Sequence, residues 1–180
     1  MSLTDFNALA ALIAGLAATI VMTAMMTMAS KAGMTRMPPM PLVMGPMMSG
    51  DRNKAMIIGG MLHYIVMGTV VFGIGYALLF QAFGSSAWPV GVLIGVVHGL
   101  AVGLVFMPMM PSMHPRMDAQ LVGAGAPAHG AVVQEVGGEV RLSGPGVLGK
   151  DWGGMTPAGL LMGHAVYGLV LALVYTAVAA

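Results

Sequence analysis

The sequence contains no cysteine and few charged residues, and both absences exclude whole classes of function. Without cysteine the chain forms no disulfide, no thiolate metal site and no thiol nucleophile. Only 7% of its 180 residues are charged, against about 25% in an average soluble domain. The net charge of +1 gives no case for a nucleic-acid partner. Hydrophobic residues make up 58%, more than so short a fold can bury, which indicates that lipid is the solvent.

Carboxylates are missing from the long apolar runs, since all six acidic residues lie outside them. An intramembrane proton or sodium relay, the usual mark of a secondary transporter, therefore lacks its acid. The sequence also has no paired acids at catalytic spacing, no G-x-S-x-G, no H-E-x-x-H and no P-loop. We therefore expect a protein that is not an enzyme.

Three charge-free runs, 6–30, 55–115 and 152–180, predict the fold class. A membrane span needs about 20 residues, and Gly84–Pro89, a turn signal with an interfacial Trp, divides the middle run in two. We predict an all-α membrane protein, a four-transmembrane-helix bundle forming a single membrane domain over 1–180. The first basic residue is Lys31, so the first helix is expected to be a retained span rather than a signal peptide. The predicted spans are 6–30, 55–82, 90–110 and 156–179.

The two longer connections, 31–54 and 111–155, are expected as loops on one side of the membrane. The first is rich in Met and Pro. The second contains two short runs, 131–136 and 139–142, around Gly137-Gly138, which predicts a small surface β-hairpin on the membrane.

All seven Lys and Arg residues fall on this loop side. The positive-inside rule then places both loops in the cytoplasm, with the chain integral to the inner (cytoplasmic) cell membrane and in contact with its lipid. Methionine-rich copper motifs are expected on the outer face instead, so the two signals disagree about orientation.

Helices one and three align without gaps, which suggests a duplicated two-helix hairpin. Gly15–Val21 matches Gly99–Val105, and His63 and His164 lie at similar places in helices two and four. Two spans per copy would keep both copies in the same orientation.

Small residues at four-residue spacing predict close helix packing, because this spacing keeps them on one helix face. Two interpretations remain open: packing inside the bundle, or docking of one face against a partner subunit. The residues concerned are Gly91, Gly95, Gly99 and Gly103 in helix three, Gly15 and Thr19 in helix one, and Gly159 and Gly163 in helix four.

His63, His98 and His164 lie within predicted helices two, three and four. An ionisable group in hydrocarbon is costly, so each should face the bundle interior and have a partner. Together they are candidate ligands for a metal ion or a haem iron, with His63 and His164 as an axial pair. The alternative is structural packing, each histidine bonding a carbonyl, a Thr or a Tyr such as Tyr64 or Tyr167.

The 21 methionines extend this hypothesis, because thioether sulfur is a soft ligand that favours Cu(I). The alternative is that Met serves as a flexible apolar filler. The candidate copper ligands near the end of helix three are Met109, Met110, Met113, His114 and Met117.

Two segments, Leu161–Tyr175 and Met107-Pro108-Met109-Met110, resemble uncharacterised bacterial and archaeal families of small four-span, Met- and Gly-rich membrane proteins. This resemblance implies the four-helix topology and no known activity. Loop 111–155 does not match that pattern.

Two functions follow from these observations. The favoured one is an accessory or structural subunit that packs against other membrane-protein subunits of a respiratory or oxygenase-like complex. The alternative is a copper- or haem-binding membrane protein that uses the intramembrane histidines and loop methionines.

Overall fold

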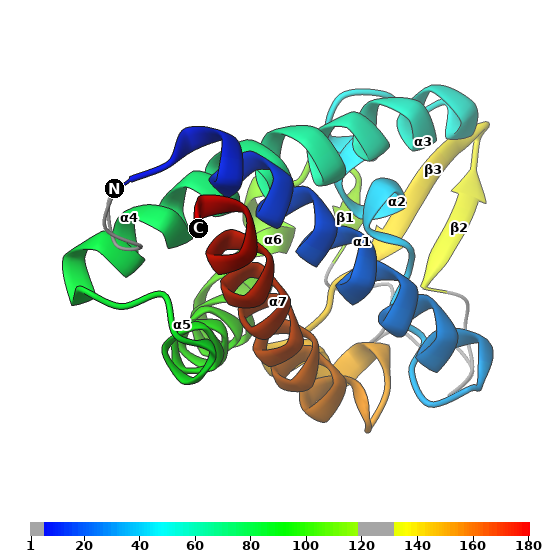
Figure 1. Cartoon of the computed structure of the whole chain (residues 1–180). Helices are drawn as coiled ribbons and strands as arrows, with labels where there is room; N and C mark the ends of the chain where they lie inside the picture. Colours follow the sequence, from blue (N-terminus) through cyan, green and yellow to red (C-terminus); the bar gives the residue numbers. More distant parts are fainter. Residues whose placement is uncertain (1–5, 119–131) are drawn as a thin grey trace. The chain divides into compact units, whose positions relative to one another are not determined.

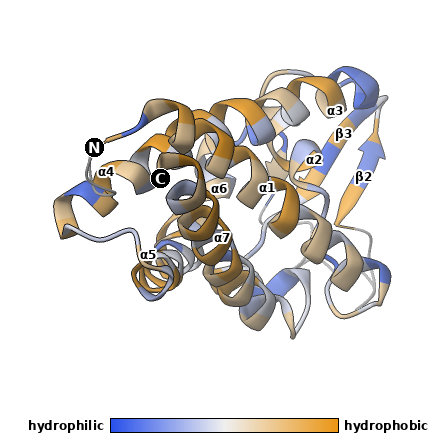
Figure 2. Cartoon of the chain, in the orientation of Figure 1, coloured by the Kyte–Doolittle hydropathy of each residue, from blue (hydrophilic) through white to orange (hydrophobic). Residues whose placement is uncertain are grey.

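The computed structural model describes residues 6–118 and 132–180. Within them, four helices are long and apolar enough to cross a membrane (Figures 1 and 2). The first is α1 (Ala8–Lys31) and the last is α7 (Thr156–Ala179). The second, Arg52–Phe83, consists of α3 (Arg52–Gly60), η2 (Met61–Phe72) and α4 (Gly73–Phe83). The third, Trp88–Met113, consists of α5 (Trp88–Ala101), η3 (Val102–Phe106) and α6 (Met107–Met113).

The ends of these helices follow local signals in the sequence. The Asp51 side chain caps α3 by accepting a 2.8 Å hydrogen bond from the Lys54 backbone N–H. Gly84 ends α4 in the left-handed region, at φ +63°. Pro157 stands in the first turn of α7, where a missing N–H costs nothing. The prediction of four long apolar helices is confirmed. The observed helix boundaries differ from the predicted ones by at most three residues, at Arg52 and Met113.

Two of the four helices contain π-helical stretches that the sequence did not predict. Met61–Phe72 in η2 and Val102–Phe106 in η3 have i→i+5 hydrogen bonding. Within η2 the Thr69 hydroxyl donates a 2.7 Å hydrogen bond to the Tyr64 carbonyl, five residues back. Such stretches are rare in proteins and often occur near functional sites.

The chain divides into two compact units, which are described separately. Unit 1 comprises Met1–Met26, Tyr64–Gly99 and Leu161–Ala180, and unit 2 comprises Thr27–His63 and Leu100–Leu160. All seven Lys and Arg residues belong to unit 2, and the described part of unit 1 contains no Lys, Arg, Asp or Glu. The division by contacts is therefore also a division by charge.

Unit 1 is held together by small residues at its helix–helix contacts. A Cβ added to Gly15 of α1 would lie 2.7 Å from the Gly68 carbonyl oxygen and 2.8 Å from the Gly73 Cα. On α5, Gly91 and Gly95 likewise lie against the α7 backbone at Gly168 and His164. Alanines of α1 and aromatic residues of α4 and α7 fill the remaining core.

Unit 2 contains a small sheet in the order β1-β3-β2, with β1 (Met117–Asp118) parallel and β2 (Val133–Val136) antiparallel to β3 (Glu139–Ser143) (Figure 1). The two-residue turn Gly137-Gly138 has positive φ at both positions, as a type I′ hairpin requires. The predicted hairpin is confirmed in its strands and turn. The third strand, β1, was not predicted. Residues 119–131 of the predicted loop, with Ala131 at the start of the first apolar run, lie outside the described residues.

The segment predicted as loop 31–54 instead contains α2 (Met40–Met44) and the 3-10 helix η1 (Gly45–Met47). Val43 joins Met107, Leu142, Trp152 and Leu160 in a core of unit 2's own. A second 3-10 element, η4 (Val147–Trp152), contributes the Trp. The prediction of a loop here was wrong because the apolar residues between the prolines are buried in this core. The core is formed by segments far away in sequence, so the local sequence did not indicate it.

Candidate functional site

Two of the three predicted histidines form a close pair in unit 1. His98 of α5 and His164 of α7 have ring centroids 4.7 Å apart and ring planes at 81°. Gly99 creates the space for this pair, since a Cβ there would lie 3.0 Å from the His164 Cβ and 3.2 Å from its Cγ. Both side chains are partly buried. The small residues that bring α5 against α7 therefore also bring the two imidazoles together.

Aromatic side chains surround His98. Its Nδ1 and the Tyr76 hydroxyl of α4 are hydrogen-bonded at 3.1 Å. The Phe72 ring lies with its centroid 4.3 Å from that of His98. When Nδ1 donates to Tyr76, the other nitrogen, Nε2, carries the lone pair that can bind a cation.

Tyr167 of α7 completes what we call the His–Tyr cluster: Tyr76, His98, His164 and Tyr167. Its ring centroid is 5.3 Å from that of Tyr76, and its hydroxyl donates a 2.9 Å hydrogen bond to the Gly68 carbonyl in η2. Both tyrosines are almost fully buried, at 3% and 2% exposure. Buried polar groups are costly unless they have hydrogen-bond partners, and here Tyr76 bonds His98 and Tyr167 bonds the Gly68 carbonyl.

The chemistry open to the His–Tyr cluster is that of neutral imidazoles and phenols. Imidazole binds copper, zinc, iron and nickel, and no acid in the described part of unit 1 would compensate a metal's charge. Across residues 6–118 and 132–180, no three His, Asp or Glu side chains gather as metal ligands. A haem bound axially between His98 and His164 would need ring centroids at least about 6 Å apart, so it does not fit the 4.7 Å observed.

His63 lies in η2 and belongs to unit 2, where it is 6% exposed. The predicted axial pair of His63 and His164 draws on both units and stays a prediction.

His114, a predicted copper ligand, has both ring nitrogens engaged in unit 2. Its Nε2–H donates a 2.9 Å hydrogen bond to the Val43 carbonyl, and its Nδ1 accepts one of 3.1 Å from the Arg116 backbone N–H. These two bonds select a single neutral tautomer. Burial lowers the pKa of His114, and the Arg116 charge lowers it further, against an opposing effect of the Val43 bond. This arrangement suits a structural residue better than a metal ligand.

The four predicted methionine ligands do not share one environment. Met117 is buried in the unit 2 core, and Met110 packs against that core. Met109 and Met113 are exposed at 49% and 61%, four residues apart on α6. The structure therefore separates these methionines into two core residues and two surface residues.

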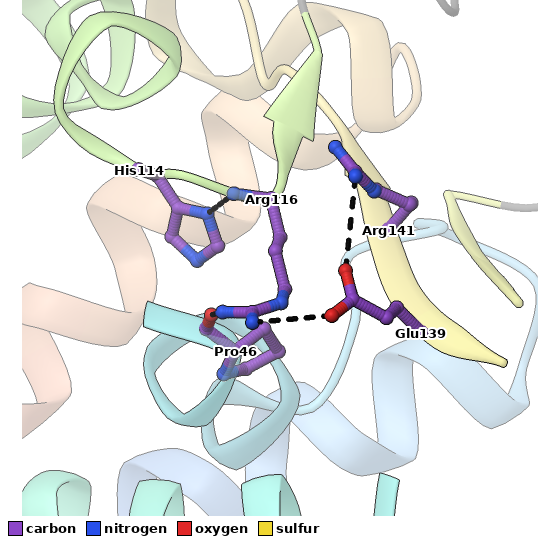
Figure 3. Close-up of polar contacts among 5 residues, drawn as sticks. All are labelled: Pro46, His114, Arg116, Glu139 and Arg141. Carbon is purple, nitrogen blue, oxygen red and sulfur yellow. Dashed lines mark hydrogen bonds and ion pairs between the residues drawn. The ribbon is translucent and has the colours of Figure 1, made fainter. Parts of the chain in front are cut away.

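Arg116 is the main residue of unit 2 that the sequence did not single out (Figure 3). Its guanidinium donates a 2.8 Å hydrogen bond to the Pro46 carbonyl and lies 3.4 Å from a Glu139 carboxylate oxygen. The other oxygen of Glu139 is 3.7 Å from Arg141. Arg116 links the end of α6 to η1 and β3, and His114 links it to α2. Its position after a proline at a helix end was the only local signal.

The predicted packing residues lie mostly at the contacts already described. Gly15, Gly91, Gly95 and Gly99 have helix atoms of unit 1 where a Cβ would be. The remaining members are Thr19, buried beside Gly68; Gly163, against Met22 and Met26; Gly103, against Leu148 and Leu160 of unit 2; and Gly159, half-buried on α7.

Four long apolar helices, a unit without charge in its described part and a charged unit with a small sheet define a membrane-type helical protein. The chain belongs to a family of unknown function, DUF6789, whose model matches residues 6–133. The match includes Met107–Met110 and ends before Leu161, so it covers one of the two segments that suggested an uncharacterised family. No curated protein and no solved structure matches the chain.

Proposed function

We propose that this is a non-catalytic integral membrane protein that serves as an accessory subunit of a larger membrane complex. Lipid is the natural solvent for unit 1, because its described residues include no charge while many large apolar side chains on its helices are exposed. Unit 2 carries every Lys and Arg, which supports a cytoplasmic position for it under the positive-inside rule.

The observation that carries the partner proposal is an apolar surface on unit 2 outside the four long helices. Six large apolar side chains there are at least 45% exposed, and lipid-facing spans do not account for them. Exposed large apolar side chains that no span accounts for point to protein or membrane contacts, and methionine adapts well to such interfaces. The six residues, which we call the unit 2 apolar surface, are Met34, Met47, Met48, Val136, Val147 and Met155.

The glycine stripes do not support the same proposal. Gly91, Gly95 and Gly99 are used within unit 1, where α7 occupies the space beside them. A partner helix would have to displace α7 to reach this face. Docking through unit 2 is therefore the form of the subunit hypothesis that the contacts favour. The pairing of α1 with η2–α4 and of α5 with α7 through glycines is also in keeping with a duplicated hairpin.

The absence of cysteine makes a clean crosslinking test possible. Met48→Cys places one thiol at the most exposed residue of the unit 2 apolar surface, and Leu93→Cys places one at a similarly exposed position on α5. Each thiol receives a photoreactive crosslinker in native membranes. We expect Met48→Cys to give one discrete adduct with another membrane protein and Leu93→Cys to give lipid adducts.

Lipid adducts alone from both variants, with a chain that purifies by itself in mild detergent, would contradict the subunit proposal. The unit 2 apolar surface would then rest on the membrane.

A further inference from the structure

We infer that Arg116 and Arg141 of unit 2 form a binding site for a phosphomonoester group, and that the Glu139 carboxylate now holds the place of that group (Figure 3). The inference does not depend on the subunit proposal, because it uses only side chains of unit 2 that contact one another. Inorganic phosphate and the headgroup of phosphatidic acid present the same chemistry, and the experiment distinguishes these two sources.

The Arg116 guanidinium is only partly satisfied by its neighbours. Its Nε is buried and has no hydrogen-bond partner among the described residues. Its Nη1 donates a 2.8 Å hydrogen bond to the Pro46 carbonyl, and its Nη2 donates a longer one of 3.4 Å to Glu139. Leaving a buried donor of a charged group unsatisfied is costly, and native proteins contain few such groups. The Nε therefore points to an acceptor that binds at Arg116.

The Nε and Nη2 donors lie on the same edge of the planar guanidinium. The N–H groups of this edge are parallel, so they match two oxygens of one carboxylate or phosphate. Glu139 uses only half of the edge, because its second oxygen lies 3.7 Å from Arg141. Both ion-pair distances exceed the roughly 2.7–2.9 Å of a well-formed charge-assisted bond. One carboxylate shared between two arginines therefore leaves both contacts weak.

A phosphomonoester matches the two arginines better than this carboxylate does. Two of its three terminal oxygens can accept from Nε and Nη2 of Arg116, and the third remains for Arg141. Its charge of about −1.5 to −2 at pH 7 balances two guanidinium groups, whereas a carboxylate carries a single negative charge. Unit 2 also contains seven basic and five acidic residues, so its net charge favours an anion.

Glu139 is placed so that it can leave the arginines. Its side chain is 45% exposed, and it stands directly after the Gly137-Gly138 turn, at the start of β3. Its carboxyl group lies against Gly50, where an added Cβ would be 2.8 Å from the Glu139 Cγ, Cδ and Oε1. These atoms belong to a flexible side chain, so a methyl group at Gly50 would push the carboxylate away. Glu139 is therefore a competitor of the ligand, and Gly50 makes room for it.

The experiment is a titration of the full chain in mild detergent with inorganic phosphate at constant ionic strength, measured by the line width in phosphorus NMR. We expect saturable binding by the wild type. Glu139→Gln removes the competing charge and should strengthen binding by about tenfold, which corresponds to one charge-assisted contact. Gly50→Ala only displaces the carboxylate, so it should strengthen binding by a smaller factor.

Arg116→Lys separates the shape of the guanidinium from its charge. Lysine keeps the positive charge but has no edge of two parallel donors, so binding should weaken by at least about tenfold. Arg141→Gln should also weaken binding, and it serves if Arg116→Lys does not fold, which circular dichroism shows. Arg52→Gln is the matched control, because Arg52 also forms a 3.4 Å ion pair with a glutamate of the sheet. It should leave the phosphate affinity unchanged.

A second measurement uses native mass spectrometry of the same variants with phosphatidic acid, and with phosphatidylcholine as the zwitterionic comparison. Selective retention of phosphatidic acid, in the same order of variants, would support a lipid headgroup as the ligand. Binding of inorganic phosphate without such retention would support a soluble phosphate. The assignment is overturned if neither probe binds, if folded Arg116→Lys binds both as well as the wild type, or if Glu139→Gln binds them no better.

Discussion

Unit 1 joins its long helices to one another through small residues, whereas the core around β3 in unit 2 is built from large ones. In unit 1 the close helix contacts include Gly168 against the Gly91 carbonyl and Gly95 against the His164 carbonyl. In unit 2 the fully buried residues include Trp152, Leu142 and Val43. The proposed membrane position of unit 1 accounts for this difference: burying apolar area gains nothing relative to lipid, so helices in lipid gain stability from close van der Waals contact. Next to water, burial itself is favourable.

Their polar groups differ in the same way. The described part of unit 1 satisfies its interior with neutral groups, as where Tyr167 bonds the Gly68 carbonyl. Unit 2 uses charge-assisted bonds such as Arg116 to the Pro46 carbonyl. Each unit should therefore respond to a different kind of substitution, and the following predictions test this.

Gly95→Ala should cause the largest loss of stability. The new methyl group would meet the His164 carbonyl carbon at 3.0 Å and the Ala165 Cα at 3.1 Å, both backbone atoms of α7. Because backbone cannot rotate away, α7 must shift, at an expected cost of about 3 kcal/mol. Unfolding by a denaturing detergent, followed by circular dichroism, measures it. Gly75→Ala is the control, since nothing lies within 4 Å of its Cβ position. Equal losses in the two variants would refute the close-packing account.

His114→Ala should destabilise unit 2 by about 2 kcal/mol, because it leaves the buried Val43 carbonyl without its donor. Hydrogen exchange resolved by peptide should show lower protection in β3 and η4 and unchanged protection in α5. Arg52→Ala, which removes a 3.4 Å ion pair between exposed side chains, should change stability by less than about 0.5 kcal/mol. If α5 loses as much protection as β3, the two units are not separately stabilised.

Local signals in the sequence were enough for most of the fold. Runs without charge predicted the four helices, and Gly137-Gly138 between two short runs predicted the hairpin. Both signals lie within a few neighbouring residues. The strand β1 has only two residues, and its pairing of Met117 with Leu142 depends on a contact far away in sequence. The π-helical stretches and the burial of Val43 depend on tertiary packing in the same way.

The sequence pointed to the histidines of the candidate site as one group, but not to the particular pair that they form. His98 and His164 stood out because histidine is costly in an apolar run. Nothing local showed that they would pair, or that Tyr76 would bond one of them. His114 and Met117 were proposed as ligands because they had no lipid to face. The structure gives them a protein core instead, through contacts with segments far away in sequence such as 43–46.

Acid should weaken unit 2 through His114. Its folded-state pKa is lowered, mainly by burial, while the unfolded chain titrates near 6.5. The unfolded state therefore binds more protons below that pH, so the stabilisation is complete above it and is lost as the pH falls towards the folded-state pKa. The slope is at most about 1.4 kcal/mol per pH unit. Exchange protection of β3, measured from pH 7.5 to 5, should fall in the wild type and fall less in His114→Gln. A parallel fall in both would assign the acid sensitivity to other groups.

Tyr167→Phe should have a small effect, and it tests whether neutral hydrogen bonds matter in unit 1. The change removes the 2.9 Å bond to the Gly68 carbonyl and keeps the ring that packs 5.3 Å from Tyr76. Hydrogen bonds inside membrane proteins contribute about 0.6 kcal/mol on average, so the detergent unfolding midpoint should shift only slightly. Gly68 lies in the π-helical stretch η2, and its carbonyl would then have to find another donor. Lower hydrogen-exchange protection confined to η2 would show that the Tyr167 hydroxyl stabilises this stretch. A loss of stability above about 2 kcal/mol would instead mean that unit 1 relies on polar bonds as heavily as unit 2 does.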